Sequence, residues 1–149
     1  MASPSQPAGM QVIPPKAASP DIPQFFRLNI EVADLDAAVA FYTKLFGIKG
    51  RKQPGRRCYF DCGPVTLQVL DVSSNHQPHT ATKALYFTVS NLEAAFSRAQ
   101  ELKCLSSEDV HSATAGEIVV HSWGERSFYV ADPRGNPLCF VEEGTVYTG

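Results

Sequence analysis

The sequence predicts an α+β fold built from tandem βαβββ modules, whose curved mixed sheets form around a concave cleft. One observation is a strand-to-helix pattern that occurs twice, 57 positions apart, as the positions of Val32 and Val89 show. The other is a length of 149 residues with 44% hydrophobic and 19% charged content, which is ordinary for one globular domain. A helix that follows the first strand of each unit packs on one face of that unit's sheet.

The repeat is visible in the residues themselves. The segment at 27–39 aligns with the segment at 84–96, and Asp34 corresponds to Asn91. Because both copies change from period two to helical period at the same place, we expect two modules of the same topology. The identical pairs are Val32/Val89, Leu35/Leu92, Ala37/Ala94, Ala38/Ala95 and Leu45/Leu102.

Each module begins with a strand and a helix. Apolar residues alternate at Leu28, Ile30 and Val32, and again in the second copy, which predicts a half-buried strand. Asp34 and Asn91 then stand where helix N-caps belong, so we expect helices at 35–46 and 92–103. Gly47 is a plausible stop for the first helix.

Short strands complete each module. In the first module they are expected at 48–52, 57–61 and 65–72, and in the second, less clearly, at 110–112, then at 127–131 and 138–142. Gly63-Pro64 and the segment Asp132-Pro133-Arg134-Gly135-Asn136 are turn signals between the last two strands of each module.

The chain divides into three parts. Residues 1–24 hold six of the eleven prolines and few charges, which is typical of an extended arm. Residues 25–143 form the predicted domain, with modules at about 25–72 and 82–143, and residues 144–149 form a C-terminal tail.

Composition excludes several classes of protein. The net charge of −2 argues against nucleic-acid binding, and no apolar run is long enough to span a membrane. The first 24 residues lack a continuous apolar stretch, so we expect no signal peptide. Four scattered cysteines do not form a disulfide scaffold, and we expect reduced thiols in a cytoplasmic protein.

Two motifs carry a family resemblance. The segment 32–42 followed by Leu45-Phe46-Gly47-Ile48, and the segment 123–142, resemble the vicinal-oxygen-chelate superfamily. This superfamily includes glyoxalase I, extradiol ring-cleaving dioxygenases, and the bleomycin and mitomycin resistance proteins. The resemblance covers about residues 25–143 and implies the fold, whereas members of one fold differ in chemistry.

The resemblance also implies where a metal would bind. Its metal-dependent members hold a divalent ion at positions that correspond here to Arg27, Gln68, Ala84 and Cys139. Ala84 has no donor atom, and a protonated arginine repels a cation. One amide oxygen and one thiolate do not make a catalytic metal site. We therefore expect no metal and no cofactor at these positions.

The concave face offers a pocket for a ligand instead. Strand parity places Asn29 and Glu31 on the same face as Arg27, opposite the uniformly apolar core positions. Arg27 would pair with an anionic group, or alternatively with Glu31 or another acid. Aromatic residues would stack on a flat ligand or fill the core: Tyr59, Tyr86, Trp123 and Phe128. The predicted ligand-binding residues are Arg27, Asn29, Gln68, Tyr86, Trp123 and Cys139.

Other polar groups give weaker signals. The basic residues between Lys49 and Arg57 are typical of a solvent-exposed hairpin. Alternatively, this hairpin would attract an anion. The histidines fall in loops or at strand ends without metal-binding spacing, although a general base among them is left open: His76, His79, His111 and His121.

These observations favour a non-catalytic protein that sequesters a small aromatic or amphipathic molecule, as the drug-resistance proteins do. The alternative is a glyoxalase- or dioxygenase-like enzyme, a lyase or oxidoreductase with a displaced metal site or none. A third interpretation is a stress or regulatory protein whose pocket is vestigial. Exposed strand edges and the family resemblance both predict a homodimer.

Overall fold

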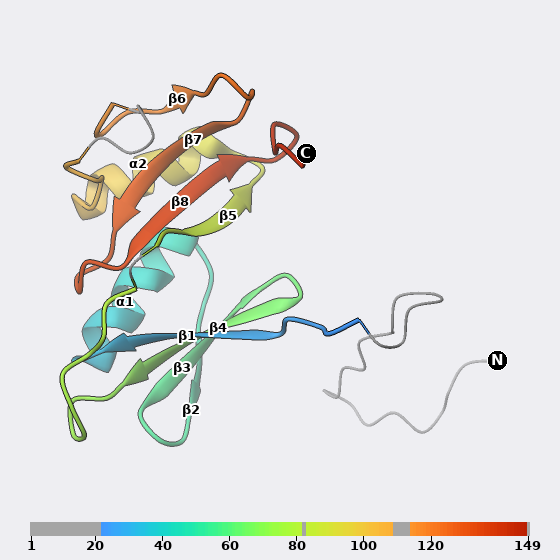
Figure 1. Ribbon diagram of the computed structural model, residues 1–149. Coiled ribbons are helices and arrows are strands. Elements are labelled where there is room, and N and C mark those ends of the chain that lie inside the picture. The colour runs from blue at the N-terminus through green and yellow to red at the C-terminus, as the bar shows by residue number, and fades with distance from the viewer. Residues whose placement is uncertain (1–21, 82, 109–113, 149) are drawn as a thin grey trace.

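The computed structural model describes residues 22–81, 83–108 and 114–148, and Figure 1 shows their arrangement. The first module contains β1 (Arg27–Val32), α1 (Leu35–Phe46), β2 (Arg51–Gln53), β3 (Arg57–Cys62) and β4 (Val65–Asp71). Its sheet has the order β1-β4-β3-β2, in which β1 runs parallel to β4 and the other pairs are antiparallel.

The second module repeats this plan. It contains β5 (Leu85–Val89), α2 (Leu92–Leu102), β6 (Val119–Val120), β7 (Arg126–Ala131) and β8 (Pro137–Glu142). The sheet order β5-β8-β7-β6 has the same connectivity, with β5 parallel to β8. The α+β fold and the internal repeat predicted from the sequence are therefore confirmed.

The helix boundaries follow from the predicted caps. The side chain of Asp34 accepts a 3.0 Å hydrogen bond from the N–H of Ala37, and Asn91 does the same for Ala94. Gly47 ends α1 at a φ of 70°, a left-handed conformation that glycine adopts without strain. Helix α2 ends at Leu102, one residue earlier than predicted, because Lys103 takes the left-handed cap position with a φ of 55°.

Two strands differ from their predicted positions. Strand β2 covers Arg51–Gln53 rather than 48–52, because pairing begins where Arg51 lies opposite Tyr59. The strand predicted at 110–112 lies outside the described residues. The short strand that pairs with β7 is β6, at Val119–Val120, which the sequence pattern did not predict.

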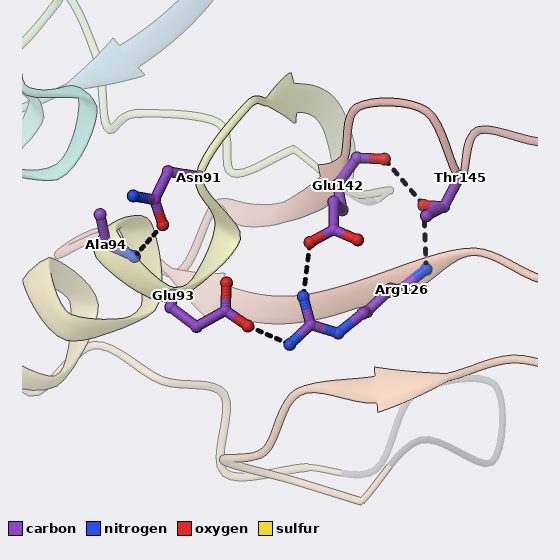
Figure 2. Close-up of polar contacts among 6 residues, drawn as sticks. All are labelled: Asn91, Glu93, Ala94, Arg126, Glu142 and Thr145. Carbon is purple, nitrogen blue, oxygen red and sulfur yellow. Dashed lines mark hydrogen bonds and ion pairs between the residues drawn. The ribbon is translucent and has the colours of Figure 1, made fainter.

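Arg126 fastens α2 to its sheet (Figure 2). Its guanidinium group donates to Glu142 at 2.5 Å and also to Glu93, in the first turn of α2. Its backbone N–H donates to the hydroxyl of Thr145 at 3.2 Å. The side chain of Arg126 therefore joins the start of α2 to strand β8, and its backbone holds the segment that follows β8.

One hydrophobic core serves both modules. It contains residues from α1, α2 and the helix-facing side of both sheets, and the Phe46 ring lies 5.1 Å from the Phe87 ring between centroids. The helices also contact each other, since Arg98 on α2 donates a 3.1 Å hydrogen bond to the carbonyl of Leu45. The opposite, concave faces of both sheets therefore point away from this core. Neither described helix has the length and apolar character needed to cross a bilayer.

Candidate functional site

The concave face of the first module carries a row of polar side chains. Strand register places Asn29, Gln68 and Tyr59 side by side on β1, β4 and β3. The amide of Gln68 donates a 2.8 Å hydrogen bond to Asn29 and accepts one of 3.3 Å from Arg57. Gln68 is buried, so its two ends are held by these neighbours and its carbonyl oxygen is already engaged.

Arg27 lies over this face. Its guanidinium carbon is 5.4 Å from the ring centroid of Tyr59 and 5.0 Å from that of Phe26, which places it within cation–π range of both. Arg51 and Arg57 also approach the Tyr59 ring. The face therefore combines a flat aromatic surface with positive charge.

Only part of that charge is neutralised. Arg51 is paired with Asp61 through two hydrogen bonds of 2.7 and 2.9 Å. Within the described parts of the chain, Arg27 has no carboxylate partner. The alternative expectation, an Arg27–Glu31 pair, does not hold, because Glu31 instead accepts from His79 at 2.8 Å. The guanidinium group of Arg27 can therefore bind an anionic group of a ligand.

The concave face of the second module has an equivalent row. Tyr86, Cys139 and Tyr129 are neighbours on β5, β8 and β7, and the two phenol oxygens lie 3.0 Å apart. Cys139 is fully buried in this row. Burial raises the pKa of its thiol to about 11, so the thiol stays protonated at neutral pH.

Trp123 lies beyond the end of this row. It stacks on His121 with ring centroids 4.3 Å apart, and His121 lies 3.0 Å from the hydroxyl of Ser127. The indole N–H donates to Glu125 at 3.0 Å. Trp123 is 43% exposed, whereas Phe128 is buried in the core and stacks on Phe140. Of the two interpretations left open for Phe128, the structure supports core filling.

The six predicted ligand-binding residues fall into two groups. Arg27, Asn29 and Gln68 lie together in the first module, and Tyr86 and Cys139 lie together in the second, with Trp123 near them. Both faces lie opposite the shared core, and no hydrogen bond or ring contact among the described residues joins the two groups. Arg57 and Tyr129 also belong to these rows but were not among the predicted site residues, although strand alternation at 57–61 and 127–131 was the signal for them.

The four positions at which the family resemblance implies a metal do not fit one. Ala84 offers no donor, and the guanidinium of Arg27 is a fixed cation. The oxygen of Gln68 already accepts from Arg57 at 3.3 Å. The thiol of Cys139 is buried and protonated. No step that depends on a metal can be assigned to these residues.

A well-defined cavity among the described residues lies elsewhere. Its volume is about 620 Å³, and its walls include the β3–β4 turn, β5, Phe46 at the end of α1 and Arg98 of α2. Its walls are mostly apolar, with Asp61 and Arg98 among the few charged residues. Of the predicted ligand-binding residues, only Tyr86 lines it.

A cluster that the sequence analysis did not single out lies where β1 ends. One ligand atom from each of Glu31, His76 and His79 lies within 4.8 Å of the others. The backbone N–H of His79 is the main influence on the Glu31 carboxyl, and it lowers the pKa of that group below its usual value. The available signal was the spacing of His76 and His79 in the loop after β4, combined with Glu31 on the concave face.

Comparison with known proteins identifies the family. The model of the Glyoxalase/Bleomycin resistance protein/Dioxygenase superfamily matches residues 24–140. The chain belongs to this superfamily. No curated protein sequence matches the chain. The glyoxalase-fold domain therefore accounts for both modules, β1 to β8.

Solved structures with the glyoxalase fold agree over the same region. Oxidase ChaP-H1 superposes with a TM-score of 0.70 at 21% identity, covering 86% of this chain and all (100%) of that one. A glyoxalase/bleomycin resistance protein from Albidiferax ferrireducens superposes with a TM-score of 0.66 at 16% identity. The match covers 80% of this chain and 98% of that one. Lactoylglutathione lyase from Agrobacterium tumefaciens superposes with a TM-score of 0.58 at 23% identity. The match covers 83% of this chain and 96% of that one. At these identities the likeness shows the fold alone.

Proposed function

We propose that this glyoxalase-fold protein binds a small aromatic or amphipathic molecule without chemically changing it. The concave face of the first module would supply Arg27, Asn29 and Gln68. The face of the second module would supply Tyr86 and Trp123, with the buried Cys139 beneath them. The favoured ligand is flat and carries an anionic group.

The observation that carries this proposal is the position of Arg27. Its guanidinium group lies 5.4 Å from the centroid of the Tyr59 ring and has no carboxylate partner among the described residues. A sulfonate, carboxylate or phosphate would form charge-assisted hydrogen bonds with it. The adjoining aromatic surface would contact the ring system of the same ligand. A polar row within apolar surroundings is typical of small-molecule sites.

A homodimer would complete the site. No hydrogen bond or ring contact among the described residues joins the two groups of predicted residues within one chain. A two-fold partner would bring the first module of one copy against the second module of the other. Strands β1 and β5 are both sheet edges, which are open to pairing. Analytical ultracentrifugation across a range of concentrations would measure this association.

Fluorescence titration tests the binding site. Anilinonaphthalenesulfonate is the probe, because it is flat, amphipathic and anionic, and Trp123 is the only tryptophan in the chain. Saturable binding is expected, with energy transfer from Trp123. Phenylnaphthylamine, which lacks the sulfonate, should bind more weakly. Substituting Arg27→Met should weaken binding of the sulfonate by about tenfold.

A matched control distinguishes binding by Arg27 from nonspecific attraction to positive charge on the protein surface. Lys49→Gln also removes one exposed positive charge, but Lys49 lies outside the concave row, so it should leave the affinity unchanged. Circular dichroism would verify that both variants fold. Equal affinities for the Arg27 and Lys49 variants, or binding that never saturates, would count against the proposal.

The second candidate is a lyase or dioxygenase-like enzyme with a displaced metal site. The observation in its favour is the Glu31, His76 and His79 cluster, which offers imidazole and carboxylate ligands. Assays with the hemithioacetal of glutathione and with catechols, each with added Zn²⁺, Ni²⁺ or Fe²⁺, would separate the two roles. Turnover that is lost in Glu31→Gln would support the enzyme and overturn the non-catalytic role.

A further inference from the structure

We propose that Glu31, His76 and His79 form a binding site for a divalent first-row transition metal ion, of which Zn²⁺ is the representative. The site lies at the end of β1, on the concave side of the first sheet. It shares no residue with the four positions implied by the family resemblance. The inference does not rest on the proposed function, because metal binding can be measured without any organic ligand.

The spacing of the three side chains suits a metal. With ligand distances of about 2.1 Å, a tetrahedral zinc ion holds its ligand atoms about 3.4 Å apart. Glu31 Oε1 is 3.2 Å from His79 Nδ1 and 3.9 Å from His76 Nδ1. The imidazole rings are 5.0 Å apart between centroids and tilted by 35°. Small side-chain movements would therefore bring all three onto one ion.

The backbone holds these residues in place. Glu31 lies within β1, where it pairs with Leu70 of β4. The loop after β4 turns back over it, because the N–H of His76 donates to Val72 O at 3.0 Å and the N–H of His79 donates to Glu31 at 2.8 Å. The carboxylate thus organises the loop that carries both histidines.

The chemistry of the ligands selects the class of metal. Two imidazoles and one carboxylate suit Zn²⁺, Cu²⁺, Ni²⁺ and Fe²⁺, whereas Ca²⁺ and Mg²⁺ prefer all-oxygen sites. Three protein ligands leave at least one coordination position for water or for a donor atom of a bound molecule. His79 is 82% exposed, and Nδ1 of His76 also contacts the carbonyl of Gln77 at 2.7 Å. Coordination must compete with that contact, so we expect micromolar rather than nanomolar affinity.

Calorimetric titration of the full chain with Zn²⁺ tests the proposal. The protein should be prepared without a histidine tag and treated with chelator before use. One zinc ion per chain is expected. Glu31→Gln and His79→Gln should each lower the affinity by at least about tenfold, since each removes one of three ligands. Glu143→Gln and His121→Gln serve as controls that remove the same residue types elsewhere, and they should bind like the unaltered protein.

Cobalt spectroscopy identifies the ligands directly. Co²⁺ at this site should give visible d–d bands without a sulfur-to-metal charge-transfer band, because none of the ligands is a thiolate. The proposal is overturned by any of three results: no saturable zinc binding, zinc binding that persists in the Glu31/His76/His79 triple variant, or a sulfur charge-transfer band. Failure here would leave the binding of anilinonaphthalenesulfonate, and with it the proposed function, untouched.

Discussion

The phenol of Tyr42 donates a 2.7 Å hydrogen bond to Asp132, and this contact joins α1 of the first module to the β7–β8 turn of the second. Both residues are buried. Asp132 also accepts from the N–H groups of Arg134 and Asn136 at 2.9 and 2.8 Å. Asn136 in turn accepts from the N–H of Ala81 at 2.6 Å, in the linker between the modules. The turn is thus a junction between the two halves of the domain.

Tyr42→Phe should lower the free energy of unfolding by about 1–2 kcal/mol, because it removes one donor from a buried carboxylate. Urea denaturation at pH 7 would measure the change. Tyr147→Phe, which alters an exposed tyrosine, is the control and should have little effect. An unchanged free energy for the Tyr42 variant would show that the inter-module contact does not contribute to stability.

The same hydroxyl predicts a response to alkaline pH. Burial, followed by the negative charge of Asp132, raises the pKa of Tyr42 above its usual value near 10. The unfolded chain therefore loses this proton at lower pH than the folded chain does. The stability advantage over Tyr42→Phe should be complete below about pH 10 and shrink above it. Denaturation curves from pH 8 to 11 would check the sign, and a growing advantage would contradict it.

Gly50→Ala should destabilise the fold by about 1–3 kcal/mol. A methyl group at this position would lie 2.4 Å from the sulfur of Cys58 and 2.8 Å from the ring of Phe60, both of which are fully buried. Thermal and urea denaturation would measure the loss. Cys58→Ala in the same chain should relieve part of the clash, so the double variant should lose less than the two single losses combined.

Asp71 predicts a response to acid. Hydrogen bonds from the Ser73 hydroxyl, and then from its backbone N–H and from Arg56, lower the pKa of Asp71 to about 2 against the opposing effect of burial. Its contribution should therefore be complete above about pH 4 and disappear as the pH falls towards 2. Asp71→Asn should cost about 1–2 kcal/mol at pH 7 and much less at pH 2. A cost that does not depend on pH would contradict this assignment.

The burial of the cysteines predicts that their thiols react slowly in the folded protein. Burial raises the pKa of Cys62, Cys104 and Cys139 to about 11, and it also raises that of Cys58. At pH 7 these thiols should react with a disulfide reagent at least about 100-fold more slowly than a free thiol. Unfolding in urea should release all four at once. Cys62 is the least buried, so Cys62→Ser should remove the fastest phase, and one rapid thiol in the folded protein would contradict this view.

Local pattern was sufficient for most of the fold. The period change at Asp34 and Asn91 predicted both helix starts, because an N-cap side chain acts within three residues of itself. Strand alternation predicted the face on which Asn29 and Gln68 meet, because side chains on a strand alternate by geometry. The short strand β6 escaped prediction, since two residues carry too little periodicity to be recognised.

The candidate sites depend on longer-range contacts. Glu31 and His79 are 48 residues apart, and nothing local indicates that the loop after β4 folds back over β1. The partner of Arg27 was equally open, because choosing between Glu31 and an external anion required the position of His79. Spacing alone could not decide either question.

By itself, the sequence determined the repeat, the two helix starts and the poor fit of the four implied positions to a metal, since these depend on residue identity and short-range geometry. The tertiary structure alone decided that the helix sides of both modules share one core and that Glu31 meets two histidines. The physical reason is that such contacts form only when distant segments pack to bury apolar surface. The sequence pattern indicates which side chains are buried, but it does not indicate which residues they contact.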